Sequence, residues 1–375
     1  MGAGVVCRGW GECAIIRGMS KHITIACGGT GGHINPAIAI AEALRQEGHA
    51  LSLILSGTRS AEAQTARTWQ GPLLKSGARP IKDPRNVLAI LRCRAFLKRQ
   101  RPDVLFATGG YMSFAPVVAA RWLGIPVVLH EANSLPGRAI RFLAKHCRIS
   151  TIATSFSETA SQLPSTARVV CTGLPLRQGV LDAVAKARAT VRPQGGFHVL
   201  VTGGSQGARG LNALVAPVLA SLAQSDPQVR IVHQCGQADM ADMAAIYAKT
   251  PGQVTLTPFI EDMGAAYGAA DVVIARAGAA TCFELARCAI PTLFVPLPTA
   301  ADDHQSKNAA ALVRCGGALS FNQLTTTPAQ FAEALRQLYS DPLLRKVMHE
   351  ALLDLPQPDA TAALVREILA AAEAR

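Results

Sequence analysis

The stretch ACGGTGGHINP, residues 26–36, has glycine at four of the five positions 28–32 and then His33. Glycines let backbone N–H groups approach a phosphate, and a helix N-terminus favours negative charge. A second loop, GGSQGARGLN from Gly203, also follows an apolar run and opens a helix-like one. An imidazole adds a proton acceptor that a phosphate cradle does not need. The two loops predict phosphate chemistry, with His33 as a candidate base or, alternatively, a residue that only caps the loop.

The spacing within the two loops argues against the common nucleotide motifs. Neither loop satisfies G-x-G-x-x-G, and neither ends in G-K-[ST], so a dinucleotide fold and a P-loop NTPase both lose their main support. His130, His233 and His304 lie far apart with no carboxylate or cysteine at ligand spacing, which favours core or hydrogen-bonding histidines over a metal site. Asp302 and Asp303 do not form a D-x-D motif. We therefore expect no metal and no cofactor.

The elements that must position these loops alternate short apolar or β-branched runs with longer helix-like ones. Such alternation is typical of βαβ units with a parallel sheet, in which ligands bind at the carboxyl ends of the strands. It runs through the first half of the chain and restarts at residue 197. The pattern predicts an α/β protein with two doubly wound, Rossmann-like domains facing a cleft. The predicted strands are 23–27, 51–56, 104–107, 127–130, 197–202, 230–234, 254–256, 272–275 and 292–295, and the predicted helices include 37–47, 114–123 and 180–189.

The length of 375 residues agrees with two domains, because a single core rarely grows so large. Residues 1–20 are interpreted as a disordered N-terminal extension, since Met19 would be a natural start before the first strand. The final segment is helical in pattern and interrupted by DLPQPDA, and we expect it to pack back on the N-terminal domain. The predicted units are 21–178, a linker at 179–196, 197–341 and the C-terminal helices at 342–375.

Composition indicates where the protein works. Ten cysteines without a C-x-x-C pair suggest a reducing, cytoplasmic compartment. No apolar stretch reaches the ~18 residues that a membrane span requires. The net charge of +12 predicts an anionic partner. Residues 79–101 interleave eight basic residues with apolar ones, which suits an anionic bilayer surface. The alternative is a solvated helix that packs on the core, and nucleic acid is less favoured because no aromatic platform accompanies the charge.

Seven motifs occur in order over residues 23–321, and together they resemble the MurG family of glycosyltransferases. The resemblance implies the glycosyltransferase-B fold, with a lipid acceptor on the N-terminal domain and the UDP-sugar mainly on the C-terminal one. It implies metal-independent, inverting transfer of N-acetylglucosamine from its UDP derivative to undecaprenyl-pyrophosphoryl-muramoyl-pentapeptide, at the cytoplasmic face of the membrane. The motifs are GGTGGHINPAIAIAEAL, TGGYMSFAP, HEANSLPGRA, TGLPLR, GGSQGARGLN, ARAGAATCFELA and DDHQSKNA.

The resemblance also implies site residues, and their chemistry agrees with the implied roles. Glu284 would accept the ribose hydroxyls, Arg276 would neutralise the diphosphate, and Gln305 with Asn308 would contact the sugar hydroxyls. His33 would be the base, with Glu131 as its rival. Simpler interpretations remain open: a first-turn helix charge for Glu284, a surface ion pair for Arg177 and a turn residue for Asn133. The full predicted donor set is Thr30, Gly31, Gly32, Asn133, Arg177, Ser205, Gln206, Ile260, Arg276, Ala279, Ala280, Thr281, Glu284 and Gln305.

The sequence departs from the family pattern on the acceptor side. Ala132 replaces a glutamine, Ile140 and Leu174 each replace an asparagine, and Pro116 comes one position late. Two alternatives therefore stay open. One is a UDP-sugar epimerase on the same fold, and the other is a non-catalytic nucleotide-sugar-binding scaffold at the membrane.

Overall fold

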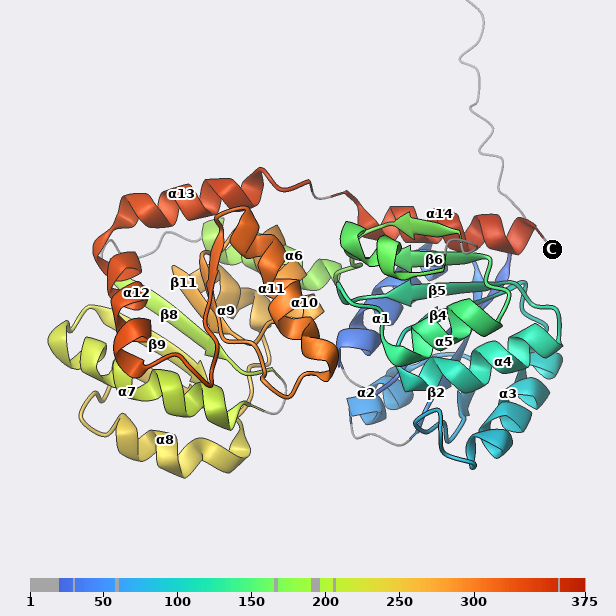
Figure 1. Ribbon diagram of the computed structural model, residues 1–375, viewed down its shortest axis with the longest axis horizontal. Helices are drawn as coiled ribbons and strands as arrows, with labels where there is room; N and C mark the ends of the chain where they lie inside the picture. The colour runs from blue at the N-terminus through green and yellow to red at the C-terminus, as the bar shows by residue number, and fades with distance from the viewer. Residues whose placement is uncertain are drawn as a thin grey trace, which may run out of the picture.

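The computed structural model describes residues 20–29, 31–57, 61–164, 168–189, 196–204, 207–356 and 358–374. Figure 1 shows two lobes, each built on a sheet with helices on both faces. Both sheets are parallel at every pair of neighbouring strands. The predicted pair of doubly wound α/β domains is therefore confirmed. The interpretation of residues 1–19 as a disordered extension lies outside the described residues.

The N-terminal sheet has seven strands in the order β3-β2-β1-β4-β5-β6-β7. The strands are β1 (His22–Ala26), β2 (Ala50–Leu55), β3 (Leu73–Lys75), β4 (Val104–Thr108), β5 (Val127–Glu131), β6 (Thr151–Thr154) and β7 (Val169–Cys171). The helices are α1 (Gly31–Gln46), α2 (Ala61–Thr68), α3 (Asn86–Gln100), α4 (Phe114–Trp122) and α5 (Arg138–His146), with 3-10 turns η1 (Tyr111–Ser113) and η2 (Ser157–Gln162).

The C-terminal sheet has six strands in the order β10-β9-β8-β11-β12-β13. The strands are β8 (Phe197–Thr202), β9 (Val229–Gln234), β10 (Val254–Thr257), β11 (Val272–Ala275), β12 (Thr292–Phe294) and β13 (Ala318–Ser320). The remaining helices of the chain are α6 (Gln178–Ala189), α7 (Arg209–Ser225), α8 (Met240–Ile246), α9 (Met263–Ala269), α10 (Ala279–Arg287), α11 (His304–Arg314), α12 (Pro328–Ser340), α13 (Pro342–Leu353) and α14 (Ala360–Glu373), with 3-10 turns η3 (Gln237–Asp239) and η4 (Ala301–Asp303).

The strand order places both glycine loops at topological switch points. β1 pairs with β2 on one side and β4 on the other, and β8 pairs in the same way with β9 and β11. The chain runs from each of these two strands, β1 and β8, into a glycine loop. In doubly wound sheets the strand order reverses here, the connecting helices diverge, and a crevice opens beyond the carboxyl ends of the strands. Both loops therefore lie where such a fold binds ligands.

The chain passes between the domains earlier than the sequence pattern predicts. Most of the expected linker, 179–196, is helix α6, which packs against α9 of the C-terminal domain. The approach is close, because a Cβ on Gly264 would lie 2.4 Å from the Cβ of Ala183. Val180 and Val184 carry the apolar side of α6 into the same core. The crossing is therefore the extended segment at 172–177, before the helix.

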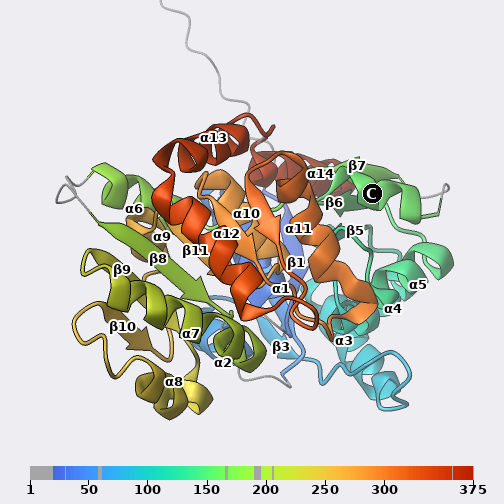
Figure 2. The ribbon, with the colours of Figure 1, turned by 60° about the vertical axis from the view of Figure 1, so that its left-hand side comes forward.

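The two C-terminal helices belong to different lobes. Helix α13 packs on α10 and α12, with Met348 and Leu352 buried in the C-terminal cores. Helix α14 returns to the N-terminal lobe and buries Leu364 and Ile368 beside α1 and β4. Figures 1 and 2 show α13 over one lobe and α14 along the other. Only the second half of the expected 342–375 unit therefore packs on the N-terminal domain, and the chain connects the lobes twice.

Candidate active site

His33 lies in the first turn of α1, at the edge of the N-terminal sheet. The helix begins at Gly31 rather than at the predicted residue 37, and Pro36 lies inside it, where it can donate no hydrogen bond to the preceding turn. The Thr108 hydroxyl at the end of β4 donates to the His33 carbonyl at 2.8 Å. The ring lies against Gly110, where a Cβ would come within 3.2 Å of Nε2. Strands β1 and β4 together hold the imidazole at the switch point.

The surroundings of His33 keep its imidazole neutral. Burial, followed by the electrostatic effect of His304, lowers the pKa of His33 to about 4. Its Nδ1 is buried and has no hydrogen-bond partner within the described ranges. At neutral pH the ring is therefore unprotonated and able to accept a proton, as a general base must be. His304 begins α11 of the opposite domain, so this electrostatic effect crosses the cleft.

Glu131, the rival base, holds a loop with both carboxylate oxygens. Its Oε1 accepts from the backbone N–H and the side-chain amide of Asn133, at 2.9 and 3.2 Å, and its Oε2 accepts from the Gly137 N–H at 2.8 Å. The side chain is buried, which raises its pKa. These bonds would have to break before the carboxylate could reach a substrate. The geometry favours Glu131 as the group that positions Asn133, and its catalytic role stays a prediction.

Glu62 is a site residue that the sequence analysis missed. Its buried carboxylate accepts from the Gly29 N–H at 2.8 Å, from the Gly57 N–H at 2.5 Å and from the Ser56 hydroxyl. A Cβ on Gly28 would lie 2.6 Å from Glu62 Oε1. Glu62 thus ties the first glycine loop to the end of β2. No motif marks it, because its partner Gly29 is 33 residues away in sequence.

The second glycine loop is held by a neutral side chain. Gln234, at the end of β9, accepts through Oε1 from the Thr202 hydroxyl at 3.1 Å and the Gly203 N–H at 3.2 Å. A Cβ on Gly207 would lie 2.1 Å from the Cys235 carbonyl oxygen, so only glycine fits there. The loop borders a pocket, but the predicted contacts Ser205 and Gln206, like Thr30 in the first loop, lie outside the described residues. The pocket is lined by Gly203, Gly207, Arg209, Arg276, Gln305 and Gln323, among others.

Arg276 forms part of the pocket wall. One of its terminal nitrogens donates to the carbonyls of Val295 and Pro296 at 2.8 and 3.0 Å, and the other donates to Gln323 Oε1 at 2.6 Å. Burial lowers the pKa of Arg276 to about 10, so it remains a cation at neutral pH. Its Nε is buried with no partner among the described residues. Most donors of Arg276 therefore already bond to protein, and its contact with a diphosphate stays a prediction.

Helix α10 carries the predicted ribose and phosphate contacts. Ala279, Ala280 and Thr281 form its first turn, and their backbone N–H groups have no earlier helical turn to bond. One turn on, Glu284 Oε2 accepts from the Tyr267 hydroxyl at 3.0 Å.

Burial raises the pKa of Glu284, while the positive charge of Arg177 on the interdomain crossing lowers it. Ile260 is half-buried against the core that contains Tyr267. The structure therefore places Glu284 near Arg177 and in contact with Tyr267.

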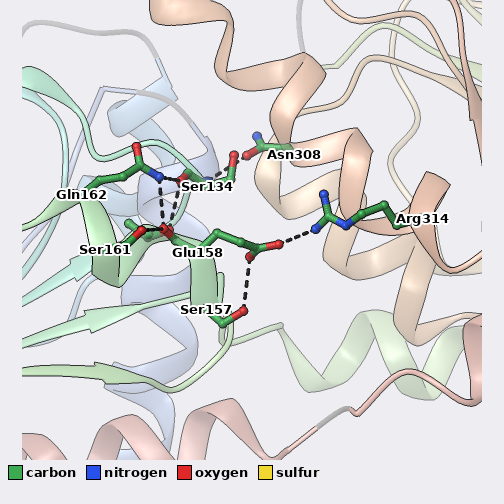
Figure 3. A network of polar contacts seen from close by, with 8 residues as sticks. Ser134, Ser157, Glu158, Ser161, Gln162, Asn308 and Arg314 are labelled. Atoms are coloured by element: carbon green, nitrogen blue, oxygen red, sulfur yellow. Dashed lines mark hydrogen bonds and ion pairs between the residues drawn. The ribbon is translucent and has the colours of Figure 1, made fainter.

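Helix α11 joins the two domains at the site. Gln305 accepts from the Leu297 N–H at 2.9 Å. Asn308, buried one turn later, accepts from the Ser134 N–H at 3.0 Å and donates to Asn133 Oδ1 and the Ala277 carbonyl, each at 3.2 Å. In this structure the Asn308 side chain makes a contact between the domains, and its contact with the sugar stays a prediction. Figure 3 shows Asn308 facing Ser134, beside the ion pair of Arg314 with Glu158.

The departures from the family pattern have a common structural setting. Ala132 and Leu174 lie in one interdomain apolar cluster with Ala279. Across the same cluster the rings of Phe156 and Phe283 make an edge-to-face contact at 5.0 Å. Replacing two polar residues by apolar ones therefore strengthens an apolar contact between the domains. Ile140, the third departure, is buried in the N-terminal core near Gly109.

Two parallel-sheet domains with a glycine loop at each switch point form the architecture of the glycosyltransferase-B fold. Residues 23–150 match the N-terminal domain of glycosyltransferase family 28, and residues 198–363 match the C-terminal domain of that family. A Geobacter sulfurreducens UDP-N-acetylglucosamine–N-acetylmuramyl-(pentapeptide) pyrophosphoryl-undecaprenol N-acetylglucosamine transferase is 34% identical over 93% of this chain and 98% of its own length. The crystal structure of Acinetobacter baumannii MurG superposes with a TM-score of 0.74 at 30% identity, covering 93% of this chain and 99% of that one. The chain belongs to the MurG family of glycosyltransferases.

A UDP-GlcNAc 2-epimerase from Neisseria meningitidis, solved bound to UDP-GlcNAc, superposes with a TM-score of 0.66 at 14% identity, over 93% of this chain and all of that one. This likeness concerns the fold alone, so the epimerase alternative is not favoured. Within the described ranges, no helix is long and apolar enough to cross a bilayer. Among the same residues, no three His, Cys, Asp or Glu side chains gather as a metal site would require.

Proposed function

We propose that this enzyme transfers N-acetylglucosamine, with inversion, from UDP-N-acetylglucosamine to the muramoyl 4-hydroxyl of undecaprenyl-pyrophosphoryl-muramoyl-pentapeptide. One observation carries the proposal beyond family membership. Asn308, one turn from Gln305, bonds to Asn133 on the N-terminal domain. Residues that the resemblance assigns to the donor therefore lie against the loop of the acceptor domain, as direct transfer between two bound substrates requires.

The proposed reaction is a single displacement. The acceptor 4-hydroxyl attacks the anomeric carbon, the bond from that carbon to the UDP oxygen breaks, and the hydroxyl proton passes to His33. The neutral His33 ring is suited to this step because its pKa is lowered to about 4 by burial and by His304. Negative charge develops on UDP, where the N-termini of α7 and α10 place positive potential. No metal and no cofactor takes part in this scheme.

The donor would lie on the side of the cleft that the C-terminal domain forms, at the carboxyl ends of its strands. In the proposal Glu284 accepts the ribose hydroxyls, the backbone at Ile260 contacts uracil, and Gln305 contacts the sugar. Thr281 and Arg276 act on the diphosphate. What supports this arrangement is that α10, α11 and the second glycine loop all begin at the carboxyl edge of one sheet.

The test is transfer of labelled N-acetylglucosamine from UDP to a prenyl-pyrophosphoryl-muramoyl-peptide. We expect a labelled lipid-linked disaccharide and an equal amount of UDP. Epimerised UDP-sugar formed without acceptor would instead indicate the epimerase. Binding of UDP-sugar without any turnover would indicate the non-catalytic scaffold. A His33→Ala enzyme run in parallel shows whether the product depends on the proposed site.

The proposal includes contact with the cytoplasmic face of an anionic membrane through α3. The helix buries Ile90 and Leu97 in the core and leaves Val87, Leu88 and Leu91 at least half exposed, a surface that we call the α3 patch. Exposed basic side chains flank it, and α4, which packs on α3, exposes Trp122. The predicted stretch is thus both a core helix and an apolar, basic surface. The exposed basic residues are Lys82, Arg85, Arg92, Arg94, Lys98, Arg99 and Arg101.

Vesicle sedimentation tests the α3 patch. Each basic residue near an anionic surface contributes ~1 kcal/mol, so binding should rise with anionic lipid and fall with salt. The variant Leu88→Ser with Leu91→Ser should bind such vesicles at least about tenfold more weakly. Leu343→Ser, an exposed leucine on α13 of the other domain, is the control. Binding that ignores both salt and anionic lipid would contradict the membrane contact.

A further inference from the structure

Arg209 lies in an unusual place for a cation. It is the first residue of α7, where the helix dipole disfavours positive charge. Its side chain is 80% exposed and lines the pocket of the second glycine loop. Only one protein contact of its guanidinium is recorded in the described structure, from Nε to Asp239 Oδ1 at 3.3 Å. A cation kept at a helix N-terminus beside a glycine loop needs a reason other than helix stability.

Asp239 is itself fixed by a buried amide. Its side chain is 6% exposed, and its Oδ2 accepts from the amide nitrogen of Asn212 at 2.8 Å. The same nitrogen also donates to the Cys235 carbonyl at 2.9 Å, so the orientation of the Asn212 amide is determined. Asn212 has no exposed surface. The carboxylate that orients Arg209 therefore cannot turn away without breaking bonds in the core.

The network continues inward to a histidine and a tyrosine. Because the Asn212 amide nitrogen donates elsewhere, its Oδ1 must accept, and His233 Nε2 donates to it at 3.1 Å. His233 Nδ1 then accepts from the Tyr247 hydroxyl at 2.9 Å. Burial lowers the pKa of His233 to about 4, so this neutral tautomer persists at physiological pH. A buried chain of hydrogen bonds thus ends at the one side chain that faces the pocket, Arg209.

The contrast with Arg276 indicates what Arg209 does. The terminal nitrogens of Arg276 donate to protein oxygens, whereas Arg209 contributes only Nε to Asp239. Its terminal nitrogens can form the two-pronged hydrogen bonds that guanidinium makes to phosphate oxygens. The unpartnered Nε of Arg276, buried in the wall of the same pocket, is a second donor for an anion.

We infer that Arg209, positioned by Asp239, binds the diphosphate of the nucleotide-sugar and of the UDP product. The inference rests on the proposed function, because it takes UDP to be the ligand of this pocket. It adds Arg209 as an exposed cation for the diphosphate, beside the buried Arg276 in the wall of the same pocket. The residues behind it, Asn212, His233 and Tyr247, are positioning residues that fix the Asp239 carboxylate.

The experiment compares UDP with uridine by calorimetry on the full chain. Arg209→Ala should raise the Kd of UDP about 10- to 100-fold, since charge-assisted bonds to phosphate are lost. Uridine has no phosphate, so its Kd should stay within about twofold of the original. Arg209→Lys should recover part of the loss. Arg336→Ala, on an exposed arginine of α12 paired with Glu333, is the control and should bind both ligands normally.

Asp239→Asn tests the positioning role. It keeps the shape but removes the charge, and its amide nitrogen replaces one of the two oxygens that accept from Arg209 and Asn212. We expect UDP to bind 3- to 10-fold more weakly, with the Kd of uridine unchanged. Unchanged UDP binding by Arg209→Ala would overturn the inference, and so would an equal loss of UDP and uridine. If the original enzyme bound no UDP at all, the proposed function itself would fall.

Discussion

The two glycine loops look alike in sequence, yet their supports carry different charge. Each follows the strand at the switch point of its sheet, β1 in one domain and β8 in the other. Behind the first loop, the carboxylate of Glu62 accepts from the Gly29 N–H. Behind the second, the neutral amide of Gln234 accepts from the Gly203 N–H. Two glycine-rich loops at equivalent places in their sheets therefore present different electrostatic environments to a ligand.

That difference separates the tasks of the two loops. A buried carboxylate near a loop repels a diphosphate, and a neutral amide does not. The second loop also has Arg209 and Arg276 in its pocket, whereas the first has the neutral imidazole of His33. The first loop is thus suited to hold a base against an uncharged hydroxyl, and the second to hold the charged leaving group. The following predictions test this division, from the largest expected effect to the smallest.

The largest effect should come from the base on the first loop. His33→Ala should lower kcat by ~100-fold or more, with little change in donor KM, because general base catalysis contributes to the transition state alone. Steady-state kinetics at saturating acceptor measures this. His146→Ala, on the exposed end of α5, is the matched control. A near-normal kcat would show His33 to be structural, and the base would then be sought at Glu131.

The second prediction concerns nucleotide recognition on the C-terminal side. Glu284→Ala should raise donor KM by up to ~100-fold through loss of hydrogen bonds to a charged acceptor, with a smaller change in kcat. Varying UDP-N-acetylglucosamine at fixed acceptor measures it. Glu333→Ala removes an exposed glutamate of α12 and should leave KM unchanged. An unaltered donor KM in the Glu284 variant would remove this residue from the site.

Much of the fold could be predicted from the sequence because its strands are buried on both faces. All five positions of β4 and of β5 are buried, and such continuous apolar runs are easily located. The missed strands β3, β7 and β13 have three residues each, and all three lie at sheet edges. Edge strands need less apolar surface, so they leave a weaker pattern in the sequence. The missed β6 has four residues and lies one strand in from the edge.

The site was only partly predictable, because several of its residues act through contacts distant in sequence. His33, Gln305 and Glu284 stand in recognisable motifs. Glu62 and Asp239 do not, since their meaning depends on which backbone groups the fold brings to them. The buried position of Asn308 against Ser134 depends on the relative placement of two domains. No periodicity within one segment contains that information.

The third prediction makes the second loop resemble the first. Gln234→Glu places a carboxylate behind the Gly203 N–H, and its repulsion of a diphosphate is roughly 1–2 kcal/mol at an effective dielectric of about 20. The Kd of UDP should therefore rise about tenfold, while that of uridine stays constant. Calorimetry above pH 7.5 keeps the new carboxylate ionised. Equal binding of UDP would contradict the electrostatic division of the loops.

The fourth prediction is the reverse change in the first loop. Glu62→Gln removes the charge. It also places an amide NH2 group opposite a backbone N–H that now donates to the carboxylate, so one hydrogen bond is lost. Free energy of unfolding should fall by about 1–3 kcal/mol, and kcat by about threefold, as the start of α1 loses its support. Donor KM should not rise. Glu42→Gln is the control, because Glu42 is an exposed glutamate of helix α1. A weaker donor affinity would mean that the first loop holds the nucleotide after all.

The smallest effect is expected in the pH profile of kcat. An ordinary histidine base, with a pKa near ~6.5, would be about nine-tenths protonated at pH 5.5 and would lose about tenfold in kcat. His33 has a pKa lowered to about 4 by burial and by His304, so it stays neutral at that pH. We therefore expect kcat to change less than about twofold between pH 8 and 5.5 and to fall only below about pH 5.

The folded state must be checked over the same range, because burial also lowers the pKa of His130 and His233 to about 4. Below pH ~6.5 these two histidines become protonated in the unfolded chain but stay neutral in the folded protein. Their contribution to the free energy of unfolding is therefore complete above that pH and declines toward pH 4. Near-UV circular dichroism at each pH separates this loss from catalysis. A tenfold fall of kcat centred near pH 6.5, in protein that remains folded, would mean that burial beside the first loop does not lower the pKa of His33. The contrast with the charged second loop would then rest on Glu62 alone.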